Sequence, residues 1–149
     1  YDGHRLEAYR FDKPSVYSGE PLATFGALTL HAARIMPDSL RVDLWWSAQR
    51  ALDVDFTTSA ILLNESGQLV AQLDSTPFLG ERQTSTWQPQ TIMYEPKPMA
   101  LIDGLTALPA GRYQVAIQVY RLTPALEIRQ IRTADDQPYV VVGEITIEP

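Results

Sequence analysis

Carboxylates, histidines and aromatic rings are the side chains with which this sequence could do chemistry. Carboxylates at neighbouring strand ends could supply the hard oxygen ligands that Ca²⁺ prefers. However, the sequence lacks the alternating acids and glycine of a calcium loop, and acids at strand ends commonly cap turns. We therefore expect no metal and no cofactor. The acidic residues at expected strand ends are Asp53, Asp55, Glu65, Asp74 and Asp103.

Catalytic patterns are weak. A glycosidase needs two carboxylates roughly 5 to 9.5 Å apart in a cleft, and Asp53 with Asp55 is the pair that could supply them. The two histidines, His4 and His31, are far apart and have no neighbouring acid and hydroxyl pattern. Cysteine is absent, and no glycine-rich phosphate loop occurs. We expect a protein that is not an enzyme, with a hydrolase built on the aspartate pair as an alternative.

Aromatic residues carry the binding signal. Trp45 and Tyr120 fall on the polar faces of expected strands, and Trp87 lies on a long connection. An aromatic surface flanked by amides such as Gln114 and Gln118 can stack against a sugar ring or a peptide. These five residues are the candidate ligand-binding residues. Packing beneath a crossing loop is the simpler role for the aromatic side chains, and Trp87 would then plug the connection.

The element that must position Gln114, Gln118 and Tyr120 is an alternating segment at residues 108–122. Pro109 restricts φ and Gly111 permits a sharp bend, so the chain turns a corner just before this strand. We expect the hydroxyl of the first strand aromatic to hold that corner, as in the tyrosine corner of other sandwiches. The face expected to be core consists of Tyr113, Val115, Ile117 and Val119.

Other segments also alternate with period 2. Residues 40–48 place Trp46 in the core, residues 56–63 and 68–74 form a hairpin, and residues 91–101 form an edge strand because Pro96 and Pro98 cannot donate ladder hydrogen bonds. Further strands are expected at 6–11, 27–35 with a bulge near Ala32, 126–132 and 139–147. The pattern predicts an all-β fold, an antiparallel two-sheet β-sandwich of the immunoglobulin-like or Greek-key type with about eight strands. Residues 1–23 are an extended lead-in, and residues 24–149 form a single domain.

Composition limits the partners. The chain has 149 residues, of which 45% are hydrophobic and 20% charged, which is typical of a globular domain. A net charge of -6 disfavours nucleic acid and anionic membrane surfaces. The apolar runs are far shorter than the roughly 20 residues of a spanning helix. Because the sequence begins at Tyr1, we expect a mature or partial chain whose membrane portion lies outside these residues.

Several motifs resemble a known region when taken together in order. The chain is similar over about residues 25–147 to the β-sandwich region C-terminal to the spans of bacterial membrane glycosyltransferases related to the dolichyl-phosphate-mannose protein mannosyltransferases. That resemblance implies an extracytoplasmic accessory domain with catalysis in the absent membrane part, and it assigns no catalytic residue here. The motifs are LWWSA at 44–48, DFT at 55–57, LVAQLDSTP at 69–77, TSTW at 84–87 and LPAGRY at 108–113.

These observations lead to one functional hypothesis and one alternative. The hypothesis is a non-catalytic extracytoplasmic accessory module, tethered to the membrane through its parent protein, that recognises a glycan or an acceptor. The alternative is a structural or protein-interaction β-sandwich without a small-molecule ligand.

Overall fold

Strands account for nearly all regular structure in the computed structural model, which describes residues 20–75 and 83–149. The helical pieces in this part of the chain are two single 3₁₀ turns, η1 (Pro37–Ser39) and η3 (Thr84–Thr86), and none is long and apolar enough to cross a membrane. The strand expected at 6–11 lies outside the described residues. The strands are β1 (Ala23–Phe25), β2 (Leu28–Met36), β3 (Arg41–Ala48), β4 (Thr57–Leu63), β5 (Leu69–Ser75), β6 (Met93–Pro98), β7 (Ala100–Leu101), β8 (Gly111–Leu122), β9 (Ile128–Ile131) and β10 (Val140–Ile147).

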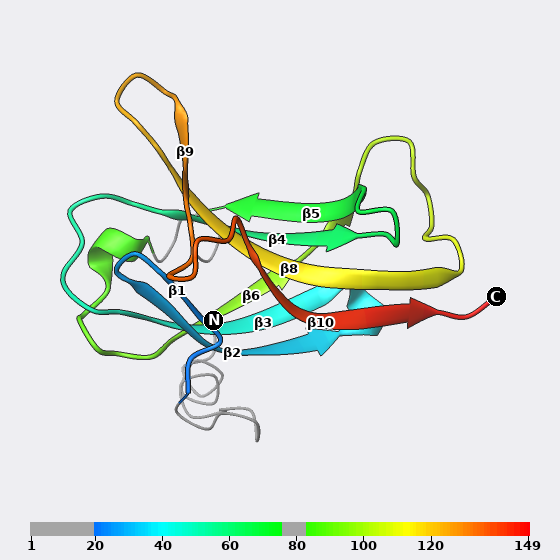
Figure 1. Ribbon diagram of the computed structural model, residues 1–149, viewed down its shortest axis with the longest axis horizontal. Coiled ribbons are helices and arrows are strands. Elements are labelled where there is room, and N and C mark those ends of the chain that lie inside the picture. The colour runs from blue at the N-terminus through cyan, green and yellow to red at the C-terminus, as the bar shows by residue number, and fades with distance from the viewer. Residues whose placement is uncertain (1–19, 76–82) are drawn as a thin grey trace, which may run out of the picture.

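Two antiparallel sheets pack face to face (Figure 1). Sheet A has the order β1-β2-β3-β6, and sheet B has the order β10-β8-β4-β5-β7 with β9 paired to β8. The expected all-β sandwich is confirmed, with ten described strands in place of about eight. The short strands β1 and β7 were not expected, because two or three residues are too few to show a period. The segment 91–101 divides between β6 in sheet A and β7 in sheet B.

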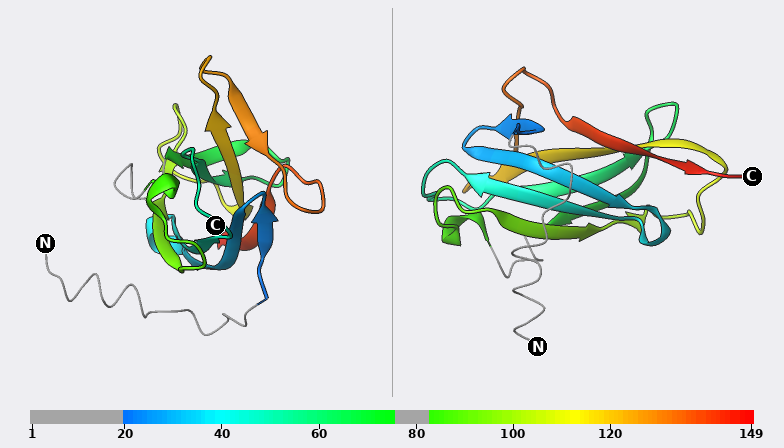
Figure 2. Two further views of the ribbon diagram at one scale, coloured as in Figure 1. Left: turned by 90° about the vertical axis from the view of Figure 1, so that its left-hand side faces the viewer. Right: turned by 90° about the horizontal axis from the view of Figure 1, so that it is seen from below.

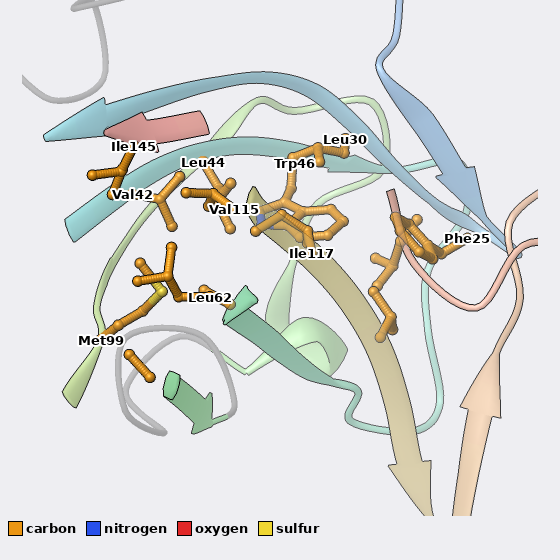
Figure 3. Packing of buried hydrophobic residues seen from close by; sticks show 14 of the residues in the cluster. Phe25, Leu30, Val42, Leu44, Trp46, Leu62, Met99, Val115, Ile117 and Ile145 are labelled. Carbon is orange, nitrogen blue, oxygen red and sulfur yellow. The ribbon is translucent and has the colours of Figure 1, made fainter. Parts of the chain in front are cut away.

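The core lies between the sheets and follows the alternation of the sequence. Trp46 is fully buried and packs on Phe25, with ring centroids 6.1 Å apart. Figure 3 shows side chains from both sheets meeting around Val115 and Ile117 of β8. The face of β8 expected to be core is buried throughout, so that prediction is confirmed. Burial of each large apolar side chain stabilises the fold by about 1.5–3 kcal/mol.

The corner before β8 is also confirmed. The Tyr113 hydroxyl donates to the carbonyl oxygen of Pro109 at 2.5 Å, and Gly111 adopts φ 150°. This hydrogen bond ties the start of β8 to the bend that precedes it. β8 then runs between β10 and β4, which makes it an interior strand of sheet B.

Three five-residue turns share one backbone pattern. The turns span residues 64–68, 123–127 and 133–137. In each turn the N–H of the first residue donates to the carbonyl of the fifth residue, and the N–H of the fourth residue donates to the carbonyl of the first. The fourth residue has positive φ in all three: Gly67 at 79°, Leu126 at 63° and Asp136 at 63°. Glycine and, less often, asparagine or aspartate favour this conformation, so leucine is the exception.

A buried ion pair joins the edge of sheet A to sheet B. Glu95 and Lys97 of β6 are both fully buried, and their charged atoms lie 3.0 Å apart. Trp46 Nε1 and the Thr58 hydroxyl donate to Glu95, at 3.0 and 2.7 Å, while Lys97 Nζ donates to the Ser75 carbonyl at 3.0 Å. The edge position expected for this proline-bearing strand is confirmed. The inward pair of opposite charges was not expected.

Candidate functional site

The five candidate ligand-binding residues occupy three separate places. Gln114, Gln118 and Tyr120 alternate along β8 and face outward from sheet B, opposite the core residues of the same strand. Trp45 lies on the outer face of sheet A, and Trp87 lies within the main core cluster. The structure therefore places the three β8 residues on one face, with Gln114 further along the strand opposite Leu63 and Glu144, and it leaves both tryptophans apart from them.

Trp45 is covered. Only 1% of its surface is exposed, although β3 points it away from the space between the sheets. Its ring contacts Tyr94 with centroids 5.3 Å apart, and the guanidinium of Arg34 lies 5.5 Å from the ring centroid. Asp43 beside it accepts from the Tyr94 hydroxyl at 2.9 Å. The expected aromatic surface at Trp45 is instead a packed cluster.

Trp87 is also covered, in the packing role that the sequence allowed. It is 4% exposed and belongs to the main core cluster. The η3 turn before it is held in place: Phe56 N–H donates to the Thr84 hydroxyl at 2.9 Å, and Ser85 N–H donates to Asp55 Oδ1 at 2.9 Å. These bonds fix the described end of the long connection against the β3–β4 loop.

A row of polar side chains crosses four strands on the outer face of sheet B. Backbone register places Asp74 of β5 opposite Ser59 of β4, and Ser59 opposite Gln118 of β8. The Ser59 hydroxyl donates to Asp74 Oδ1, and the Gln118 amide donates to Ser59 at 3.4 Å. Gln130 of β9 donates to Gln118 Oε1 at 3.2 Å. We call Asp74, Ser59, Gln118, Gln130 and the adjoining Tyr120 the polar row.

Tyr120 extends the row as its aromatic member. Burial raises the pKa of its hydroxyl, and the neighbouring Asp74 carboxylate raises it further through its charge and a side-chain hydrogen bond. The hydroxyl therefore stays protonated at neutral pH and donates to Asp74. The ring is partly exposed, whereas Ser59 is fully buried within the row and hydrogen-bonds to Asp74 and Gln118 on either side of it.

Sequence reasoning identified Gln118 and Tyr120 of the row and missed the other three members. Asp74 was considered as a metal ligand, and Ser59 and Gln130 were not considered. The β4–β5 hairpin offered a local signal, since its turn brings Ser59 near Asp74 across the strands. Pairing of β4 with β8 joins residues about 60 positions apart, and no pattern in either strand reports it.

The other acidic candidates lie apart from the row. Asp53 and Asp55 lie in the β3–β4 loop rather than on a strand, and Glu65 lies in the turn at 64–68, where it accepts from Arg112 N–H at 3.2 Å. Asp103 follows β7. Among the residues that the structure describes, no three histidine, aspartate or glutamate side chains gather so as to hold a metal ion.

The fold and the outer face of sheet B together define an antiparallel β-sandwich domain with an outward-facing polar row. Among solved structures, the chain is similar to the crystal structure of the C-terminal domain of Wzt, with a TM-score of 0.53 and 11% sequence identity over 93% of this chain and 95% of that one. No protein-family model and no curated protein matches the sequence. At this identity the likeness concerns the fold. None of these comparisons relates the chain to membrane glycosyltransferases.

Proposed function

We propose that this chain is a non-catalytic module that binds an uncharged, hydroxyl-rich glycan on the outer face of sheet B. The observation that carries the proposal is the polar row, to which four adjacent strands each contribute a hydrogen-bonding side chain. Asp74, Ser59 and Gln118 lie at one level of sheet B, and Gln130 lies two residues further along, opposite Tyr120. Rigid strands fix the spacing of these groups before any ligand arrives, which lowers the cost of ordering them on binding.

The chemistry of the row fits adjacent sugar hydroxyls. The Asp74 carboxylate accepts hydrogen bonds, and the Gln118 and Gln130 side chains both donate and accept. Hydrogen bonds to a charged group stabilise a complex by about 1.5–3 kcal/mol each, more than bonds between neutral groups. Tyr120 adds a partly exposed ring beside these amides, the arrangement on which a pyranose can stack.

Charge selects against acidic ligands. The chain carries a net charge of -6, and Asp74 is exposed in the row itself. No positive side chain belongs to the row, so a uronic acid or a phosphate would approach a carboxylate without compensation. A neutral glycan meets no such repulsion.

The setting that we propose is extracytoplasmic, as an accessory domain of a longer cell-envelope protein. Support comes from the resemblance to the C-terminal region of membrane glycosyltransferases. The similar solved structure is likewise the C-terminal domain of a longer protein. An open reading frame that encodes membrane-spanning segments beside this domain is the expected finding.

The binding test uses isothermal titration with neutral oligosaccharides and one uronic-acid oligosaccharide of matched length. We expect a neutral sugar to bind in the millimolar range or tighter and the acidic one not to bind. Tyr120→Ala and Asp74→Asn should each weaken binding about tenfold, the effect of about 1.4 kcal/mol. Gln88→Ala, an exposed glutamine on the loop after Trp87, is the control and should bind as the parent does. Equal binding by Tyr120→Ala and Gln88→Ala, or no neutral ligand in the millimolar range, would contradict the proposal.

A further inference from the structure

Large exposed apolar side chains in the described part of the chain gather in two places. One is the hairpin of β8 and β9 beyond Tyr120, residues 121–129, which we call the arm. The other is a hollow of about 380 Å³ between β1 and the segment that leads into β10. The exposed fractions are 55% for Leu122, 78% for Leu126 and 68% for Ile128 on the arm, and 46% for Leu22 and 43% for Val141 at the hollow.

The arm has little support from the rest of the molecule. β4 pairs with β8 only as far as Tyr120, so beyond it the ladder consists of β8 and β9 alone. Figures 1 and 2 show the arm extending away from both sheets. A two-stranded hairpin is marginally stable in water without something packed on it. A surface that covers the apolar side chains of the arm would therefore stabilise it.

The arm also carries a pair of like charges. Arg121 and Arg129 lie directly opposite each other across the two strands, and like charges in that position repel. Neither arginine has an ion-pair partner among the described residues. The two arginines and Glu127 give the arm a net charge of +1 (two positive charges and one negative) in a chain whose net charge is -6.

The tip of the arm differs in residue type from the other two turns that share its backbone pattern. Three turns share one backbone pattern, and the positive-φ position holds Gly67, Asp136 and, in the arm, Leu126. Leucine is disfavoured there, whereas glycine, asparagine and aspartate are tolerated. The arm accepts an unfavourable residue that places its apolar side chain at the outermost point, which a contact made by that side chain would explain.

The hollow has the complementary character. Leu22, Tyr139 and Val141 supply apolar lining, and the carboxylate of Asp135 lies on an exposed turn at its rim. An enclosed cavity of about 150 Å³ holds a benzene ring, so the hollow has room for the side chains at the tip of the arm. The arm combines exposed apolar side chains with a net positive charge, and the hollow combines apolar and polar lining with the Asp135 carboxylate at its rim.

We propose that two copies of this chain form a reciprocal dimer in which the arm of each copy packs into the hollow of the other. Both halves of the contact occur on the same chain, so a two-fold axis makes the contact twice and closes the assembly. The arm extends away from its own sandwich, which leaves the hollow open to the arm of a partner. Arg129 then faces the acidic rim near Asp135, opposite in sign.

The test is sedimentation velocity over a range of concentrations on three single variants. Leu126→Asn removes the tip side chain while suiting the positive-φ position, and Val141→Lys places a charge in the hollow. Both should shift dimer to monomer, by at least tenfold in the dissociation constant. Gly67→Asn puts the same residue at the same position of the turn at 64–68, outside the contact, and should dimerise as the parent does.

A mixture of the Leu126→Asn and Val141→Lys variants tests whether the arm and the hollow contact each other. Leu126→Asn retains an intact hollow and Val141→Lys retains an intact arm, so the mixture should form heterodimers through one remaining arm-to-hollow contact. A parent that stays monomeric at all concentrations, or a dimer unaffected by either variant, would overturn the proposal. A mixture that fails to associate would overturn the reciprocal arrangement. Circular dichroism verifies that each variant is folded, and the glycan proposal is untouched by any of these outcomes.

Discussion

Removing the Lys97 ammonium group should strongly destabilise the fold, because it leaves the buried Glu95 carboxylate without its opposite charge. Lys97→Met keeps the length and apolar stem of the side chain but loses the 3.0 Å ion pair and both hydrogen bonds to Ser75. The Thr58 and Trp46 hydrogen bonds to Glu95 remain. The perturbation therefore removes the ammonium charge together with its two hydrogen bonds to Ser75 and leaves the other contacts of Glu95 in place.

Two physical arguments give the magnitude. Unit charges 3.0 Å apart attract with roughly 5 kcal/mol at an effective dielectric constant of about 20. Breaking a buried ion pair from one side costs about 3–5 kcal/mol in measured cases. We expect Lys97→Met to lower the free energy of unfolding by about 3–5 kcal/mol at pH 7. The double variant Glu95→Gln/Lys97→Met removes both charges and should lie within about 1 kcal/mol of the parent, since replacing such a pair is often close to neutral.

The pH dependence gives a second, independent signature. Burial raises the pKa of Glu95 above its usual 4.5, and Lys97 opposes that shift. In Lys97→Met this opposition is lost, so the folded-state pKa rises further. When the folded-state pKa lies above the unfolded value, protonation of Glu95 stabilises the folded state. This contribution to the free energy of unfolding is fully present below about pH 4.5 and is lost as pH rises through the folded-state pKa. Lys97→Met should therefore recover stability on acidification, by up to about 1.4 kcal/mol per pH unit.

Urea unfolding followed by tryptophan fluorescence measures these quantities directly. Trp46 reports on the pair itself, since its Nε1 donates to Glu95. Burial lowers the pKa of Lys97, so Glu95→Gln should show the opposite trend and recover stability as pH rises. A Lys97→Met variant that loses less than about 1 kcal/mol, or whose loss is the same at pH 5 and pH 7, would refute the reasoning.

Three further outcomes are open to the same unfolding assay. Tyr113→Phe removes the hydrogen bond to the Pro109 carbonyl and should cost about 1 kcal/mol; an unchanged midpoint would show that the corner does not depend on it. Gly143→Ala places a methyl group against Ile35 and should cost about 1–3 kcal/mol. Adding Ile35→Val removes the opposing methyl group and should restore part of that loss, whereas additive losses would contradict the steric cause. Leu126→Asn should raise the stability of the monomer by about 0.5–1 kcal/mol, because asparagine tolerates φ 63° better than leucine does; a loss would argue against strain at that turn.

Period-2 alternation predicted most of the strands because one face of each is core. Along β3 and β8 the apolar residues at every second position lie in the core between the sheets. In β3 the alternate residues Asp43, Trp45 and Ser47 are buried as well, on the outer face of sheet A. β6 breaks this rule, since its inward positions hold Glu95 and Lys97. Each charge is acceptable because the two residues pair along β6 and because sheet B supplies a further partner to each, Thr58 to Glu95 and Ser75 to Lys97. These partners on sheet B are distant in sequence.

In the candidate site, too, the sequence predicts the direction of a side chain but not what lies over it. The outward direction of Gln118 and Tyr120 followed from the alternation of β8 alone. Whether an outward aromatic is exposed depends on what lies over it, and Trp45 is covered even though its direction was predicted correctly. The row exists because pairing of β5, β4 and β8 aligns Asp74, Ser59 and Gln118, and pairing of β8 with β9 places Gln130 opposite Tyr120 beside them; these pairings are a property of the whole sheet.

The alternation of β8 also explains how a fold can be shared at 11% identity with the C-terminal domain of Wzt. Its inward residues need only be apolar and of suitable size, a requirement that many sequences meet. The outward residues Gln118 and Tyr120 contribute little to the core, so substitutions there cost little stability. Selection can thus change the outer face while the inner face keeps the sandwich. Similarity of fold therefore carries no information about the ligand of the polar row, and binding measurements on Tyr120 and Asp74 variants must identify it.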